Sequence, residues 1–232
     1  MSFAQPETAG LSGVYKQSVE TRARFITRTY AHLFGAILAF AGVEYALFAS
    51  GLAMPIASVL SGNWLVVLGG FMLVGWLGRR MAYGSASLPV QYLALAGFVL
   101  AEAIVFLPLL AIADAQFPGA IQSAGLVTLV GFAGLTGVAF TSRKDFSFLG
   151  SLLKWGGILA LVAIVASLIF GFQLGVFFSV AMIGLAGASI LYDTSNIIRH
   201  FPEDRYVGAA LELFSSVALM FWYVLRLFMN RD

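Results

Sequence analysis

The sequence of 232 residues contains no cysteine, only two histidines and few charged residues, which make up 10% of the chain. Without cysteine there is no disulfide, no thiol chemistry and no cysteine-bound metal. His32 and His200 are too few to form a histidine-based metal site. No phosphate-binding loop, HExxH motif or Ser/His/Asp order occurs, and no lysine lies in the middle of an apolar run. We therefore expect a protein that is not an enzyme and that holds no cofactor.

Long apolar runs dominate what is present. Hydrophobic residues make up 60% of the chain and the mean hydropathy is +0.93, whereas a soluble domain is about 45–50% apolar. The runs continue for about 20 residues, the length of a membrane-spanning helix, and do not alternate as barrel strands do. The net charge of +2 is too small to indicate a nucleic-acid partner, so the expected partner is the lipid bilayer. The predicted fold is an all-α polytopic membrane protein with seven transmembrane helices: 30–49, 64–81, 89–112, 120–140, 151–171, 174–198 and 206–229.

The first 29 residues are polar and form a predicted segment of their own, in front of a seven-helix transmembrane domain over 30–232. Tyr15, Val19 and Ile26 recur at helical spacing opposite a face that carries arginines, which indicates an amphipathic helix at the cytoplasmic membrane surface. The alternative is a disordered tail whose last turns extend the helix 30–49. No cleavable signal peptide is expected, because the first apolar run follows a polar segment with four basic residues.

Basic residues occur at alternate ends of the predicted helices, and the loops 50–63, 113–119 and 172–173 contain none. By the positive-inside rule, the N-terminus is cytoplasmic and seven spans place the C-terminus outside. Arg226 and Arg231, at the outer end of the last helix, do not follow the rule. The residues that carry the assignment are Lys16, Arg22, Arg24, Arg28, Arg79, Arg80, Arg143, Lys144, Lys154, Arg199 and Arg205.

Two acids interrupt the last two apolar runs, Asp193 in helix 174–198 and Glu212 in helix 206–229. At ~1.5 Å per residue both lie roughly 8 Å from the same membrane face, on neighbouring antiparallel helices. An ionisable group inside a membrane costs at least ~2.5 kcal/mol near its centre and indicates a function. Two such carboxylates within a few ångströms share a proton, which predicts a proton sensor or a cation ligand. The alternative is that they only fix helix packing.

Helix 206–229 carries a polar stripe along its whole length, because polar residues recur there at spacings of three and four. A helix with such a stripe does not face lipid, so we expect protein around it. The members expected to be buried are Gly208, Glu212, Ser215 and Tyr223.

A second set of charged residues lies deeper in the membrane, with Glu44 in helix 30–49 and Glu102 in helix 89–112. Arg226 reaches a neighbouring depth, so we expect it to pair with one of these acids. Arg79 and Arg80 end helix 64–81 and are expected to anchor it among lipid headgroups, or to supply a counter-ion for Asp193.

The last two helices resemble a known family in two stretches, Leu191-Tyr192-Asp193-Thr194 and the segment 224–228, with sequence VLRLF. With seven helices over residues 28–229, the chain resembles a bacterial member of the Bax inhibitor-1 family, the transmembrane Bax inhibitor motif proteins. The resemblance implies a bundle with the last helix at its centre. It also implies an inner-membrane location and a pH-sensitive leak that carries calcium as the transported ion.

The resemblance assigns the leak to a carboxylate pair on the sixth and seventh helices. Asp193 matches the acid of the sixth helix, and Glu212 stands where the family pattern has aspartate. An arginine on the second helix latches the first acid in the closed state, a role that falls to Arg79 or Arg80. Some bacterial relatives look instead like modulators of a membrane-bound protease. A regulatory membrane protein that binds such a protease is therefore the competing expectation.

Overall fold

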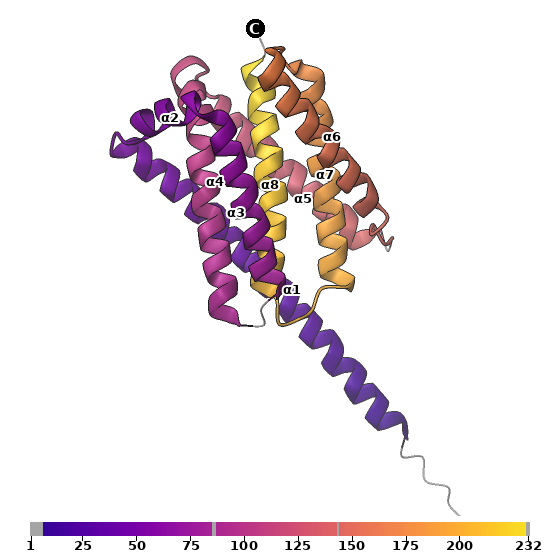
Figure 1. Ribbon diagram of the computed structural model, residues 1–232. Coiled ribbons are helices and arrows are strands. Elements are labelled where there is room, and N and C mark those ends of the chain that lie inside the picture. Colours follow the sequence, from indigo (N-terminus) through magenta and orange to yellow (C-terminus); the bar gives the residue numbers. More distant parts are fainter. Residues whose placement is uncertain (1–6, 85–86, 143, 231–232) are drawn as a thin grey trace, which may run out of the picture.

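The structure is a computed structural model that describes residues 7–84, 87–142 and 144–230 of the chain. In this part of the chain every regular element is a helix (Figure 1). The helices are α1 (Glu7–Ala49), α2 (Ala53–Gly62), α3 (Trp64–Gly84), α4 (Leu88–Gln116), α5 (Ala120–Thr141), α6 (Leu149–Phe170), α7 (Gly175–Arg199) and α8 (Tyr206–Met229). The predicted all-α fold is confirmed.

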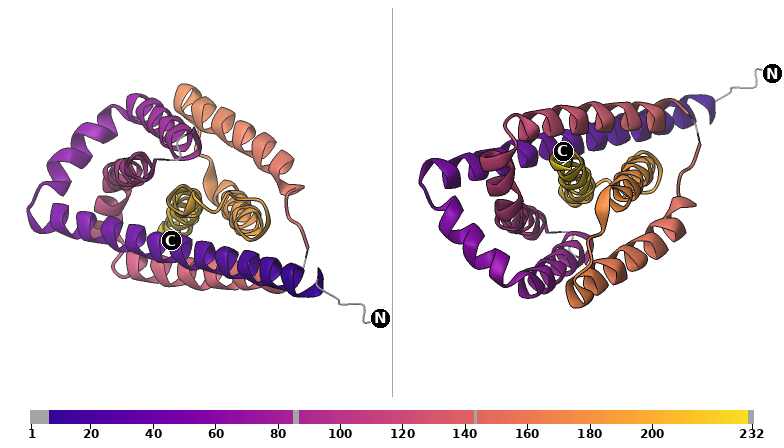
Figure 2. Two further views of the ribbon diagram at one scale, coloured as in Figure 1. Left: turned by 90° about the horizontal axis from the view of Figure 1, so that it is seen from below. Right: turned by 90° about the horizontal axis from the view of Figure 1, so that it is seen from above.

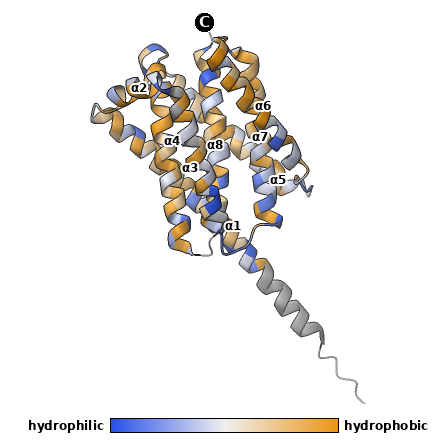
Figure 3. Cartoon of the chain, viewed as in Figure 1, coloured by the Kyte–Doolittle hydropathy of each residue, from blue (hydrophilic) through white to orange (hydrophobic). Residues whose placement is uncertain are grey.

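Six of the helices are long and apolar enough to cross a membrane, and the bent pair α2–α3 makes a seventh span if the two count as one. Large apolar side chains point outward, as at Trp155 and Phe177, which are 68% and 93% exposed. Hydrophobic residues cover most of the bundle, and hydrophilic residues gather toward the end where α7 and α8 are joined (Figure 3). This is the surface of a polytopic membrane protein, with a span count close to the predicted seven.

Helix α2 corrects the sequence-based expectation, which treated 50–63 as a loop. Its proline, Pro55, stands in the first turn, where the missing backbone N–H removes no hydrogen bond. Ala53 and Ala57 of α2 pack against Leu107 and Ala111 of α4, so the helix is held by close contact between small side chains. Between α2 and the membrane-crossing part of α3 the chain bends by 100°.

Helix α1 is continuous from Glu7 to Ala49 and passes the expected boundary at residue 29 without a break. Its described residues therefore do not form a disordered tail. The first turns of α1 extend beyond the bundle (Figure 1). Whether they lie at a membrane surface stays a prediction.

Helix α8 lies at the centre of the bundle, and Figure 2 shows it end-on with the other helices around it. It contacts α1, α3, α4, α5 and α7. Two hydrophobic clusters along α8 form the core, one near the α7–α8 connection and one toward its far end. In the first, Phe214 packs edge-on against Phe98 of α4 and Phe40 of α1. The predicted central position of the last helix is confirmed.

Candidate functional site

The two predicted carboxylates lie on either side of the connection between α7 and α8. This connection is short because α7 ends in a tight turn, in which the backbone N–H groups of His200 and Phe201 both donate to the carbonyl of Asn196. Arg205 N–H donates to the carbonyl of Pro202 just before α8 begins. The helices therefore run antiparallel and in contact, with Asp193 and Glu212 close to the same end of the bundle.

Asp193 is buried, with only 8% of its surface exposed. Its carboxyl is hydrogen-bonded to hydroxyl groups. Ser216 Oγ of α8 lies 2.6 Å from Asp193 Oδ2 and 2.8 Å from Ser189 Oγ of α7. A hydroxyl carries one proton, so Ser216 donates to only one of these oxygens at a time, and the Ser189 hydroxyl also hydrogen-bonds to the Asp193 carboxyl. These hydrogen bonds join the two helices at the depth of the acid.

Glu212 lies one helical turn before Ser216 on α8, and its charge interacts with that of Asp193. The side chain of Glu212 is half-buried, although its Oε1 atom is closed to solvent. Of the other stripe residues expected to be buried, Gly208 and Tyr223 are buried and Ser215 is half-buried. The structure thus brings the two acids into electrostatic contact, with Asp193 more enclosed than Glu212.

Tyr30 of α1 approaches the same place, with its hydroxyl 3.5 Å from Thr194 Oγ1. The phenol also contacts Thr136 of α5 and lies within electrostatic range of Asp193. Sequence reasoning missed Tyr30, because 164 residues separate it from Thr194. It also missed Ser216, although the spacing of four from Glu212 was a usable signal. Helices α1, α5, α7 and α8 therefore all contribute to the surroundings of Asp193.

The loop between α5 and α6 is tied to the end of α7 by Asp145. Its Oδ1 accepts from the Ser147 N–H at 2.9 Å and from Ser195 Oγ at 3.4 Å, and its Oδ2 lies 3.5 Å from His200 Nε2. The Ser147 N–H holds the pKa of the Asp145 carboxyl below its ordinary value, and the nearby charges of the α7 end act in the same direction. Phe146 N–H in turn donates to Ser195 Oγ at 3.0 Å. The loop is thus fastened two residues from Asp193.

Arg22 of α1 also contacts the α7–α8 connection. Its Nη1 donates to the carbonyl of Phe201 at 2.6 Å, and its Nε forms an ion pair with Glu203 at 3.4 Å. A longer contact of 3.5 Å reaches the carbonyl of Ile197. An arginine at the end of α7 satisfies carbonyl groups that the helix leaves without partners.

Neither Arg79 nor Arg80 reaches Asp193 in this structure. Both are exposed, and within the described residues no ion pair joins either of them to an acid. The Arg79 guanidinium lies near Gly75 of its own helix, and the Arg80 guanidinium lies 5.2 Å from the centre of the Trp76 ring. The latch that the resemblance implied therefore stays a prediction.

The expected ion pair of Arg226 with Glu44 or Glu102 is not formed, and that prediction is wrong for this structure. Among the described ion pairs none includes these residues. Glu102 lies near the middle of α4, whereas Arg226 lies in the last turn of α8. Glu44 is buried between the two neighbours on its helix face, Phe40 and Phe48, which both pack into the core cluster around α8. The predicted depths of Arg226 and the two acids were counted from approximate helix ends, so they were too imprecise to show that these residues lie at different levels.

The comparison with known proteins now decides the family. Residues 22–232 match the family model described as "Inhibitor of apoptosis-promoting Bax1". The chain belongs to the Bax inhibitor-1 family. The resemblance read from the sequence is thereby confirmed, over nearly the whole chain.

Relatives in this family come from bacteria and plants. The chain is 37% identical over 111 residues to an uncharacterized protein of Pseudomonas aeruginosa. It is 36% identical over 95 residues to the "Modulator of FtsH protease YccA" of Escherichia coli K12, and equally to the "Inner membrane protein YccA" of E. coli O6:H1. These matches cover 47% and 40% of the chain and 49% and 43% of the relatives. The chain thus spans about half the length of these relatives.

A longer match joins the chain to "Protein LIFEGUARD 4" of Arabidopsis thaliana, at 29% identity over 223 residues. It covers 91% of the chain and 87% of the plant protein. The similarity to this plant protein therefore extends along almost the whole chain.

Within this family member, the carboxylate pair is the candidate ion site. Among the described residues no cluster of three or more Asp, Glu or His side chains is able to hold a metal ion. Calcium takes about six to eight oxygen ligands. Asp193 and Glu212, with the hydroxyls of Ser189 and Ser216, supply part of such a set.

Proposed function

We propose that this chain is a proton-responsive calcium leak of the bacterial inner membrane, with its N-terminus in the cytoplasm and its C-terminus outside. The single observation that carries the proposal is the electrostatic interaction of Asp193 with Glu212 between two antiparallel helices of a membrane bundle. A bundle that needs only packing has no use for two acids at one depth, since each costs free energy in a membrane.

Protons and calcium compete for the same carboxylate oxygens. When the pair is ionised, its two charges repel each other, and a divalent cation relieves the repulsion by binding hard oxygen ligands. When a proton is shared between the acids, the repulsion is relieved without the cation. A fall in pH therefore weakens calcium binding at the pair and changes the contact between α7 and α8.

The α5–α6 loop and Arg22 support this proposal, because both fasten the α7 end close to Asp193. These two sets of contacts lie outside the apolar core and limit how far α7 can move relative to α8.

In a closed conformation, Arg79 or Arg80 would supply the counter-charge for Asp193. Arg79→Gln or Arg80→Gln would then raise the calcium leak, whereas the exposed Arg24→Gln, as a control, would leave it unchanged.

The proposal is tested by calcium entry into liposomes that contain only this full-length chain. We expect entry above that of protein-free liposomes at neutral pH. Asp114→Asn removes an exposed acid at the end of α4 and serves as the matched control, with unchanged flux. Liposomes with correctly folded protein and no calcium entry at any pH would contradict the leak.

The second candidate function is regulation of a membrane-bound protease. It is favoured by the likeness to the E. coli protein named modulator of FtsH protease, and by the first turns of α1, which extend beyond the bundle. In this case the carboxylate pair stabilises the fold, and α1 carries the contact with the partner. Degradation of a membrane substrate by such a protease would change when the chain is added, while liposomes would show no calcium flux.

A further inference from the structure

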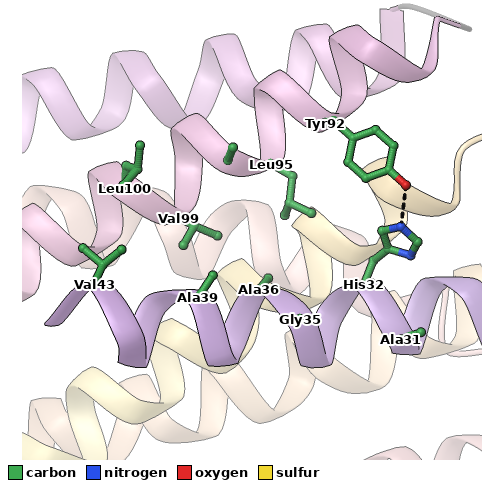
Figure 4. A pocket seen from close by; sticks show the side chains of 11 residues that line it. Ala31, His32, Gly35, Ala36, Ala39, Val43, Tyr92, Leu95, Val99 and Leu100 are labelled. Carbon is green, nitrogen blue, oxygen red and sulfur yellow. Dashed lines mark hydrogen bonds between the residues drawn. The ribbon is translucent and has the colours of Figure 1, made fainter. Parts of the chain in front are cut away.

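A groove of about 470 Å³ runs along the outside of the bundle between α1 and α4 (Figure 4). Small side chains make up part of its lining, among them Gly35, Ala36 and Ala39 of α1 and Ala96 of α4. From His32 to Val43 the groove follows twelve residues of α1, whose eleven steps span about 16 Å at ~1.5 Å per residue. That is about half of the ~30 Å hydrocarbon thickness of a bilayer, which is the depth of one leaflet.

Polar groups close one end of this groove. His32 Nε2 lies 2.7 Å from the Tyr92 hydroxyl, and the two side chains point toward each other across the groove (Figure 4). The His32 ring also lies 5.1 Å from the ring of Tyr206 at the start of α8. The Arg28 guanidinium, one turn earlier on α1, stands 5.4 Å from the Tyr206 ring and acts electrostatically on Tyr92.

The positive charge at this end is not neutralised within the bundle. Arg28 is exposed and forms no ion pair with any acid in the described part of the chain. A second groove, of about 490 Å³ between α5, α7 and α8, is lined only by apolar residues and glycines. The groove between α1 and α4 therefore differs from it in having a charged and hydrogen-bonding end.

We propose that the groove between α1 and α4 binds a phospholipid, with one acyl chain along the small residues and the phosphate at Arg28, His32 and Tyr92. The length fits a chain that reaches from the membrane surface to the bilayer centre. The Arg28 guanidinium complements the phosphate charge and donates to its oxygens, while the ring nitrogens of His32 are already bonded to the Arg28 carbonyl and the Tyr92 hydroxyl. This binding site is independent of the calcium leak.

A transmembrane helix of a second copy is the competing occupant, because small residues at spacings of four also let helices approach closely. A helix that fills the groove with apolar side chains leaves Arg28 without a counter-charge. The charged end therefore favours the lipid, and the helix becomes an outcome of the test.

Gly35→Leu is the variant that fills the groove. A Cβ at Gly35 meets no atom within 4 Å, so the change adds volume without displacing the backbone. Gly157→Leu is the matched control, since Gly157 lies on α6 away from the groove, is exposed and also has free space at its Cβ position. Both changes raise helix propensity by the same amount.

The measurement is native mass spectrometry of the purified full-length protein titrated with phosphatidylglycerol. We expect one saturable lipid adduct in the wild type and in Gly157→Leu, with affinity reduced at least ~tenfold in Gly35→Leu, a loss of about 1.4 kcal/mol. Arg28→Gln should weaken the adduct about fivefold, as expected for one basic residue near a lipid surface. Diacylglycerol, which lacks the phosphate, should bind no better to the wild type than phosphatidylglycerol binds to Arg28→Gln.

Equal adducts in wild type and Gly35→Leu would overturn the proposal. The proposal would also be overturned if the wild type formed dimers that Gly35→Leu dissociates while the lipid adducts persist, because the groove would then hold a second copy. If Gly35→Leu does not fold, Arg28→Gln decides the question, and an unchanged affinity in that variant would rule out the phosphate site.

Discussion

Two buried acids of this protein differ in their surroundings. Asp193 accepts a hydrogen bond from Ser216, whereas neither oxygen of Glu44 has a hydrogen-bond partner among the described residues. Glu44 is 7% exposed and faces apolar residues of the core. A buried polar group without a partner costs about 1–3 kcal/mol. The buried carboxyl of Glu44 therefore lowers the stability of the folded protein, and the lack of a hydrogen-bond partner that causes this does not apply to Asp193.

Replacing Glu44 by leucine should therefore stabilise the protein. The expected gain is about 2 kcal/mol, which corresponds to a rise of about 4–8 °C in the melting temperature for a chain of this size. Thermal unfolding in detergent measures it, with Glu20→Leu as the control because Glu20 is exposed. A lower melting temperature in Glu44→Leu would show that Glu44 has a stabilising partner in solution.

Asp145 is a charged residue of the α5–α6 loop, outside the membrane-spanning helices. Asp145→Ala removes the acceptor for the Ser147 N–H and for Ser195 Oγ, so the α5–α6 loop should be cut faster by trypsin after Lys144. The pKa of Asp145 is lowered, so its carboxylate holds the loop above the ordinary aspartate pKa near 3.9 and releases it only as the pH falls through the lowered value. The carboxylate is therefore ionised throughout the range from about pH 6 to 8, and Asp145→Ala should be cut faster than the wild type at both ends of it. Equal cleavage rates in variant and wild type would contradict the assignment of the loop to Asp145.

At the scale of elements, the contact of α1 with the α7–α8 connection depends on Arg22. Arg22→Leu removes the bond to the Phe201 carbonyl and the ion pair with Glu203. Both Arg22 and Glu203 are partly exposed, so the expected loss is about 1–2 kcal/mol of folding free energy. Arg24→Leu is the control, because Arg24 is exposed and, among the described contacts, bonds only to the Glu20 carbonyl of its own helix.

Thermal unfolding of both arginine variants is the measurement for this contact. Arg22→Lys keeps the charge but loses the forked geometry, so it should recover only part of the loss. Equal melting temperatures for Arg22→Leu and Arg24→Leu would mean that the contact does not stabilise the connection.

The helices themselves could largely be predicted from the sequence, because a run of about 20 apolar residues has few other structures in a membrane. Helix α2 could not, since ten residues with a proline read equally well as a loop. The pairing of Arg226 failed for a related reason. Periodicity places a residue on a face, but an error of one helical turn at each end moves its depth by about 5 Å.

The candidate site was also predictable only in part. Asp193 and Glu212 stand out because acids are costly in apolar runs. Tyr30 and Ser216 do not stand out, since tyrosine and serine occur widely in transmembrane helices. Their proximity to Asp193 follows from how α1 and α8 pack against α7. Contacts between distant segments are a property of the tertiary structure, and one sequence does not reveal them.

At the scale of the whole molecule, a central helix carries one member of the carboxylate pair and its neighbour carries the other. Because α8 contacts α1, α3, α4, α5 and α7, a change in the α7–α8 contact reaches most of the bundle. A bundle arranged in this way can couple the protonation of two side chains to the packing of several helices. The proposed leak requires this coupling, whereas a regulator that acts through α1 does not.

The most direct test of this account is the pH profile of calcium flux in liposomes from about pH 6 to pH 8, compared between wild type, Asp193→Asn and Glu212→Gln. Both changes keep the side-chain shape and remove the charge. We expect each to flatten the profile, and the double change to add little, because a pair that shares a proton titrates as a unit. Asp114→Asn should keep the wild-type profile. If Asp193→Asn and Glu212→Gln keep it as well, the pair serves packing and does not gate the leak.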